Sequence, residues 1–212
     1  MAERLTPERR KELTRDALVD AAATLFARKG FVAASLDEIA ETAGFSRGAI
    51  HFHFDSKDDL FVAVLERYHD RLLAASVARA LADDAFPGDP ATTAAAWKEI
   101  HDEGGGDHVL LNLEFRTYAL RNPSFARRAA KLEAEAGAAT AEVLAQRAET
   151  HGLRWTMPIE QVTELLYATS GGLLERDAVS GANSEAGFAA FLSLLWEASL
   201  EPVRKPKARR RS

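Results

Sequence analysis

The amino-acid sequence predicts an all-α fold of about nine helices. Alanine is abundant among the 212 residues and runs of β-branched residues are absent, which favours helices over strands. Apolar residues recur at a spacing of three and four residues, as one buried helix face requires. Capping residues, glycines and prolines mark the ends of these segments. With 47% hydrophobic residues, the chain can bury one large core or two modest ones.

The first part of the chain predicts two helices in succession. Pro7 stands at a favourable first position, and Gly30 ends the first helix. Ser35 and Glu38 are three residues apart and form a capping box that starts the second helix. Gly44 then ends that helix after only about two turns. The two predicted helices are therefore a long one and a short one.

A third, very short helix is predicted to begin at Ser46. Ile50 and Phe54 lie four residues apart and are expected to face the core. Ser56 and Asp59 form a second capping box, which starts a long fourth helix reaching to about residue 81. A helix of two turns is not stable alone, because nucleation is costly. Its neighbours must therefore support it.

Five further helices are predicted after the loop "DDAFPGDP". The segments "EGGGD", "RNP" and "LRWTMP" separate them, and Pro202 stops the last one. The expected helices cover about 90–102, 107–120, the "RNP" joint to about 151, 159–180 and 184–200. We expect no strand.

Composition excludes several classes of protein. The absence of cysteine excludes disulfide scaffolds, thiolate metal sites and cysteine nucleophiles. The charged first residues do not form a secretory signal, and no apolar run reaches the roughly 18 residues of a transmembrane helix. We therefore expect a soluble, intracellular protein. Nucleophile-elbow and phosphate-loop spacings are absent, so we expect neither an enzyme nor a cofactor.

The net charge is −5, but its distribution is uneven. Basic residues exceed acidic ones in residues 1–15, and 203–212 contain six basic and no acidic side chains. Basic ends can bind nucleic acid, although charged tails also serve solubility alone.

Two short helices joined by a glycine-containing turn and braced by a longer one describe a helix-turn-helix. A DNA major groove about 12 Å wide admits one helix, and only the first turns of that helix reach the base edges. DNA reading thus explains why the third predicted helix is so short.

The segment "GFVAASLDEIAETAGFSRGAIHFHFDSKDDL" resembles the DNA-binding module of the tetracycline-repressor (TetR) family of bacterial transcription regulators. The resemblance covers about residues 11–71, and its most specific part is "IAETAGFSRGAI". "LEFRTYALRNPSF" is similar, less specifically, to a segment of the family's second domain. The resemblance implies a helical ligand-binding and dimerisation domain over 72–202. We expect 203–212 to form a basic, disordered tail.

The resemblance also implies a set of DNA contacts. Serines at helix starts would bring hydroxyl and N–H groups to phosphates, Arg47 would bind guanine or a phosphate, and His53 and Lys57 would hold phosphates. Gly48 would allow close approach, and His51 stands where the family usually has a phosphate-binding tyrosine. The implied DNA-binding residues are Ser35, Ser46, Arg47, Gly48, Ala49, His51, His53 and Lys57. His51 and His53 face different sides of a helix, so we expect no metal site.

The two last predicted helices are candidates for a homodimer interface. Residues 188–196 are apolar almost all round, and a helix of that kind needs cover on two sides. Small residues in 168–172 permit close helix approach. The alternative is a core helix covered by its own chain. The predicted interface residues are Leu165, Ala168, Gly172, Phe188, Phe191, Leu192, Leu195 and Trp196.

Polar and aromatic residues on the central helices are candidates for an effector site. An apolar cavity with a few polar groups suits an aromatic or amphipathic organic compound. Ordinary core packing is the alternative for each residue. The candidates are Trp97, His101, His108, Asn112, Phe115, Tyr118 and Tyr167.

These observations lead to one functional hypothesis. The sequence predicts a dimeric DNA-binding transcription regulator in the bacterial cytoplasm, in simplest form a repressor that a small-molecule effector releases from a palindromic operator. The alternatives are an activator, a regulator without an effector, and a helical ligand-binding protein or enzyme with a vestigial DNA module.

Overall fold

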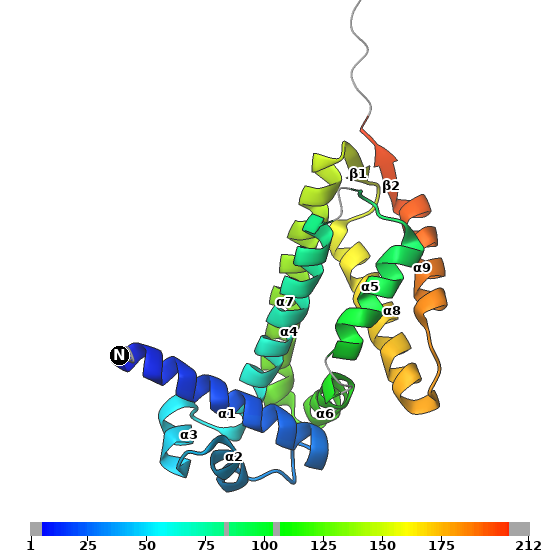
Figure 1. Ribbon diagram of the computed structural model, residues 1–212. Coiled ribbons are helices and arrows are strands. Elements are labelled where there is room, and N and C mark those ends of the chain that lie inside the picture. The colour runs from blue at the N-terminus through cyan, green and yellow to red at the C-terminus, as the bar shows by residue number, and fades with distance from the viewer. Residues whose placement is uncertain (1–5, 83–84, 104–106, 204–212) are drawn as a thin grey trace, which may run out of the picture. The chain divides into compact units, whose positions relative to one another are not determined.

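The computed structural model describes residues 6–82, 85–103 and 107–203. The predicted basic tail, apart from Val203, lies outside the described residues. The described residues form nine helices and two short strands (Figure 1). The elements are α1 (Pro7–Lys29), α2 (Leu36–Ala43), α3 (Arg47–His53), α4 (Lys57–Ala82), α5 (Pro90–Glu103), α6 (Asp107–Arg121), α7 (Pro123–Thr150), β1 (Leu153–Trp155), α8 (Ile159–Ser180), α9 (Glu185–Ser199) and β2 (Leu200–Pro202).

The predicted all-α fold is confirmed, and the expectation that no strand forms is wrong. Strands β1 and β2 pair antiparallel, with Leu153 opposite Pro202 and Trp155 opposite Leu200. Each strand has only three residues, which is too short for the alternating pattern that identifies a strand in a sequence. No helix among residues 6–82, 85–103 and 107–203 is both long and apolar enough to cross a bilayer.

The chain divides into two compact units. The first contains the residues up to Leu72 together with His101–Ala134, and the second contains Leu73–Ile100 together with the residues from Glu135 onward. Helices α4, α5 and α7 contribute residues to both units. The second half of the chain therefore supplies α6 and the start of α7 to the unit that holds the helix-turn-helix.

Aromatic rings form the centre of the first unit. Phe61 of α4 is fully buried and stacks on Phe31, with the ring centroids 4.4 Å apart. The same ring contacts Phe26 of α1 edge to face and stacks on Phe125 of α7. Phe115 of α6 completes the cluster. Because aromatic rings bury large apolar areas, this core supplies a rigid base for the short helices.

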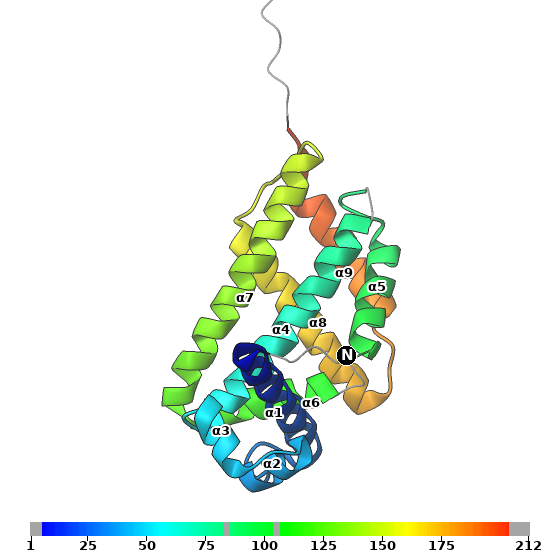
Figure 2. The same cartoon turned by 60° about the vertical axis from the view of Figure 1, so that its left-hand side comes forward.

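The core also holds α2 and α3 in place. Ile39 of α2 and Ile50 of α3 are fully buried, and Phe54 directly after α3 is nearly so. Figures 1 and 2 show α1, α2 and α3 packed together, and contacts join each pair of these helices. The inward direction predicted for Ile50 and Phe54 is confirmed. Burying one apolar face stabilises a helix that is too short to persist alone.

A contact distant in sequence links α6 to the end of α1. The carboxylate of Glu114 accepts a hydrogen bond from the backbone N–H of Phe31, at 2.9 Å. The preceding residue, Gly30, ends α1 with φ at 81°, and a Cβ there would lie 3.1 Å from the same carboxylate. Glycine is therefore required both by its backbone conformation and by this close approach.

The second unit has its own smaller core. Trp97 of α5 packs against Phe188 of α9, with ring centroids 4.4 Å apart, and Ala94 and Leu192 are buried beside them. Helices α8 and α9 run next to each other in both views and contact one another (Figure 2). One side of α9 is therefore used inside its own chain.

Candidate nucleic-acid interface

The start of α2 is fixed by a reciprocal capping box. The Ser35 hydroxyl accepts from the Glu38 backbone N–H, and the Glu38 carboxylate accepts from the Ser35 backbone N–H. Lys29 and then Ser35 stabilise the charged carboxylate, which lowers the pKa of Glu38 to about 2. The predicted capping box is confirmed. The Ser35 hydroxyl also donates to Glu38, so it is engaged within the chain.

The turn between α2 and α3 depends on Gly44. This residue is left-handed, with φ 77° and ψ 24°, a conformation that side chains disfavour. The chain then reverses through Phe45, and Ser46 becomes the N-cap of α3. The Ser46 side chain makes no capping hydrogen bond, in contrast to that of Ser35.

Helix α3 has seven residues and one outward face. Ile50 turns inward, which leaves Arg47, Gly48, His51 and Phe52 exposed. A Cβ built on Gly48 would meet only the Ser46 hydroxyl, at 3.5 Å, so the fold itself has room for a side chain there. Because Gly48 has no side chain, it leaves a depression in the outward face of α3 between the longer exposed side chains of that helix.

The side chain of Arg47 bonds to two neighbours. Its Nη1 donates to Oδ2 of Asp37 at 3.0 Å, and its Nε donates to Nε2 of His51 at 3.4 Å. The guanidinium therefore lies along the outward face of α3 and is linked to the first turn of α2.

Phe52 belongs to this surface and was not among the predicted DNA-binding residues. Its side chain is 69% exposed, and the Lys11 ammonium lies 5.1 Å from its ring centroid. The sequence contained a signal for this position. Ile50 and Phe54 share the inward face, so the residue midway between them has to point outward.

Two cations of α1, Lys11 and Arg15, lie beside α3. The Arg15 guanidinium lies 5.4 Å from the Phe54 ring, next to Lys11 on α1. His53 is partly buried, and its pKa is lowered by desolvation and by the charges of Lys11 and Arg15. A neutral imidazole N–H can donate to phosphate without adding charge. Ala49 is partly buried beside Gly48.

The Lys57 side chain packs on the loop between α1 and α2. Its Nζ donates to the Val32 carbonyl at 3.2 Å and lies 4.6 Å from the Phe31 ring centroid. Partial burial lowers the pKa of Lys57. The side chain is thus positioned at the loop before α2, and its predicted role on phosphate stays a prediction.

The predicted effector residues are divided between the two units. His108 is buried in the first unit, stacked on Tyr68 and 5.3 Å from the His101 ring. Tyr118 donates to Asp58 at 3.1 Å. Phe115 is part of the aromatic core, Asn112 is partly buried on the same helix, and Trp97 and Tyr167 belong to the second unit. The Tyr167 hydroxyl lies 2.6 Å from Oγ1 of Thr140.

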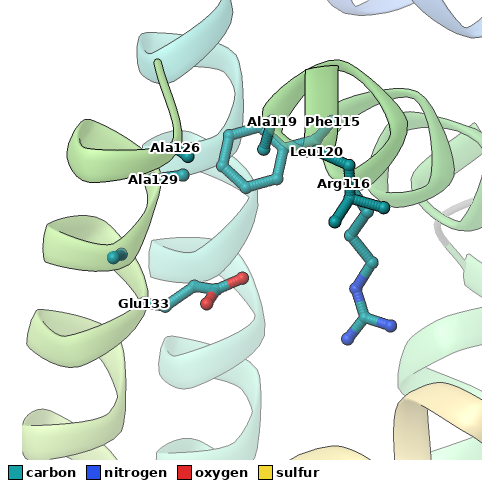
Figure 3. A pocket seen from close by; sticks show the side chains of 8 residues that line it. Phe115, Arg116, Ala119, Leu120, Ala126, Ala129 and Glu133 are labelled. Carbon is teal, nitrogen blue, oxygen red and sulfur yellow. The ribbon is translucent and has the colours of Figure 1, made fainter. Parts of the chain in front are cut away.

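A groove of about 300 Å³ lies between α6 and α7 in the first unit (Figure 3). Alanines and Leu120 form most of its wall, and Arg116 and Glu133 are its charged residues. Phe115 is the member of the predicted effector set that lines it. The other predicted effector residues are not brought into this groove.

The predicted interface residues lie on two sides of α8 and α9. Phe188, Leu192 and Leu195 are buried in their own chain, and Phe191 and Trp196 are partly buried. Leu165, Ala168 and Gly172 of α8 are exposed. Leu194, which was not predicted, is 68% exposed on α9. The exposed apolar residues of α8 and α9 therefore differ in part from the predicted interface residues.

Two short helices joined by the Gly44 turn, with the second packed on a buried core and its outward face exposed, form a helix-turn-helix. Residues 18–64 match the model of the bacterial regulatory proteins of the tetR family. The chain therefore carries a TetR-family DNA-binding domain and, over its described length, has the TetR fold.

Curated relatives resemble the N-terminal part of the chain. The HTH-type transcriptional activator FasR of Mycolicibacterium smegmatis is 43% identical over 60 residues, which cover 28% of this chain and 27% of FasR. The regulator AcrR of Shigella flexneri is 39% identical over 77 residues, covering 36% and 34%. The repressor KstR2 of Rhodococcus jostii is 41% identical over 58 residues, covering 27% and 28%. The matched segment thus spans about a quarter to a third of each relative.

Solved structures resemble most of the chain. A TetR-family regulator from Rhodococcus sp. has a TM-score of 0.74 at 19% identity, covering 87% of this chain and 98% of that one. A second Rhodococcus regulator has a TM-score of 0.64 at 25% identity, covering 91% and 99%. At 19% identity, the similarity to the first of these structures shows only that the two chains share a fold.

Proposed function

We propose that the chain is a dimeric transcription regulator of the bacterial cytoplasm that binds a palindromic operator and that a small organic effector releases. The observation that carries this proposal is the outward face of α3. Arg47, Gly48 and His51 are exposed on a helix that has no stability of its own. Lys11 and Arg15 place positive charge beside that face, which favours contact with phosphates.

The α8–α9 surface supports a dimer. Leu194 is 68% exposed and Val179 is 85% exposed, and Leu165 is 41% exposed. Ala168 and Gly172 on the same side of α8 permit close approach of a partner helix. Exposed apolar residues on neighbouring helices favour association with a second copy. Two copies would present two reading helices, which dimeric helix-turn-helix proteins use for two half-sites roughly 34–36 Å apart.

The names of related proteins support an effector and leave its identity open. One solved neighbour, from Saccharomonospora viridis, was determined in complex with choline, and another, from Bacillus halodurans, is named a fatty acid degradation regulator. We propose that an effector favours an arrangement of the dimer in which the two α3 helices no longer match the two half-sites. About 1–3 kcal/mol of such coupling changes operator affinity 5–150-fold.

Activation is the second candidate function. FasR is named an activator and KstR2 a repressor, and this chain resembles both over its DNA-binding domain. An activator would bind the same kind of operator with the same face of α3. A reporter gene placed behind the operator distinguishes the two, because deletion of the regulator raises expression under repression and lowers it under activation.

The DNA-binding proposal is tested by selecting sites from random duplexes with the full-length protein. We expect enrichment of a palindrome whose affinity falls steeply with salt. Arg47→Ala should weaken binding and relax the preference at one base pair of each half-site, whereas Lys57→Ala should weaken binding to all sequences. No enrichment at moderate ionic strength would refute the proposal, and equal losses on specific and random DNA for Arg47→Ala would refute the role of that residue.

A further inference from the structure

Asp37 carries a negative charge on the surface that we propose for DNA. A carboxylate beside the reading helix weakens binding to every phosphate backbone. The Asp37 side chain is 64% exposed in the first turn of α2. It is not needed to cap α2, because Ser35 and Glu38 satisfy each other there. The charge is favourable near a helix N-terminus, but that position does not require the contact that Asp37 makes.

That contact is with Arg47. Nη1 of Arg47 donates to the Asp37 carboxylate at 3.0 Å, while Nε donates to His51 at 3.4 Å. The guanidinium is thus held at two of its edges. Among the described residues, no hydrogen bond from Nη2 of Arg47 is present, so this group and the second Nη1 hydrogen remain available for a planar acceptor.

The stability of α3 does not account for the position of Arg47. Arg47 occupies the first position of α3, where a cation is unfavourable because of the helix dipole, and α3 has no side-chain cap. The stability of α3 therefore does not explain an arginine there. The ion pair is also more than half exposed, and exposed pairs contribute little to folding.

A fixed guanidinium matters for reading a base. Guanine presents O6 and N7 side by side in the major groove, and arginine binds both with two parallel N–H groups. An arginine that is already ordered loses less conformational entropy on binding this fixed pair of acceptors. A phosphate can be bound from many directions, so an ordered arginine improves phosphate binding less than guanine binding.

We propose that Asp37 is a positioning residue that aligns Arg47 with a guanine of the operator and, by its own charge, weakens binding to all other DNA. Asp37 is then a determinant of sequence specificity. This inference rests on the proposed function of the chain as a DNA-binding regulator.

The experiment uses the full-length protein and the operator that the wild type selects. Fluorescence anisotropy measures the affinity for three duplexes: the operator, the operator with the Arg47-dependent base pair replaced, and random DNA. The proteins are the wild type, Asp37→Asn, Asp37→Ser, Arg47→Ala and the double variant Asp37→Asn with Arg47→Ala. Two substitutions at position 37 are made so that the result does not depend on the folding of one of them.

We expect the position 37 variants to bind random DNA about two- to tenfold more tightly at low salt, since one repulsive charge per subunit is removed. We expect them to discriminate the guanine from its replacement about tenfold less well. In the Arg47→Ala background, Asp37→Asn should leave the base preference unchanged. Glu41→Gln is the matched control, because it removes an exposed charge from the same helix. It should leave the discrimination of the wild type intact.

Three results would overturn the inference and leave the proposed function standing. The first is an unchanged ratio of operator to replaced-site affinity in the position 37 variants. The second is a changed base preference when Asp37→Asn is added to Arg47→Ala, because Asp37 would then act on specificity without Arg47. The third is an Arg47→Ala variant with unaltered base preference. A wild-type protein that enriches no sequence would overturn the proposed function and this inference together.

Discussion

Replacing Gly48 with alanine should separate folding from DNA binding. Gly48 is helical, and a Cβ at this position would meet only the Ser46 hydroxyl, at an ordinary contact distance of 3.5 Å. Glycine in a helix costs about 0.5–1 kcal/mol relative to alanine. We therefore expect Gly48→Ala to stabilise the protein by up to that amount, which corresponds to a rise in Tm of about 1–4 °C for a chain of this size.

The same methyl group should impair DNA binding. Gly48 lies at the low point of the outward face of α3, where the proposed approach of a base pair is closest. An added methyl in a well-packed contact costs about 1–3 kcal/mol, which is 5–150-fold in affinity. Differential scanning calorimetry measures the Tm, and fluorescence anisotropy measures the affinity for the selected operator.

Gly137 provides a matched control for this experiment. It lies in the helix α7, and nothing lies within 4 Å of a Cβ built there. Gly137→Ala should raise Tm by a similar amount and leave operator affinity unchanged. A Gly48→Ala protein that melts earlier, or that binds the operator as tightly as the wild type, would refute the argument.

Three further predictions follow from the contacts of single residues. Gly30→Ala should lower the free energy of unfolding by about 1–3 kcal/mol in urea titrations, because φ is 81° and the new Cβ would lie 3.1 Å from the Glu114 carboxylate. Because Lys29 holds the pKa of Glu38 at about 2, below its ordinary 4.5, Glu38 contributes stability above pH 4.5 that is lost as the pH falls toward 2. Urea titrations at several pH values should then show that the difference between wild type and Glu38→Gln disappears at low pH, and a constant difference would contradict this. Leu194→Glu should convert the proposed dimer into a monomer in size-exclusion chromatography with light scattering, and a variant that stays dimeric would remove α9 from the proposed interface.

Much of the fold could be predicted because its signals are local. The capping box of Ser35 and Glu38 and the glycine end of α2 are contained in stretches of a few residues, and the structure confirms them. The inward direction of Ile50 and Phe54 followed from helical spacing alone. The strands β1 and β2 could not be found in this way, because pairing between Leu153 and Pro202 joins segments that are far apart in the chain.

The candidate site could be predicted only in part. The sequence placed Arg47, Gly48 and His51 on one helix, and the same spacing could have identified Phe52. The carboxylate that orients Arg47 comes from another helix, and its contact depends on how tightly the Gly44 turn brings α2 and α3 together. The predicted effector residues were chosen by residue type, which carries no information on which side chains share a cavity.

The sequence by itself determined where the helices begin and end and which short helix needs support, since capping, glycine conformation and apolar spacing act over a few residues. The tertiary structure alone decided that Glu114 closes the end of α1, that Asp37 holds Arg47, and that Leu194 is exposed while Leu192 is buried. These contacts and exposures depend on which helix faces pack together, and that packing is determined by the core as a whole.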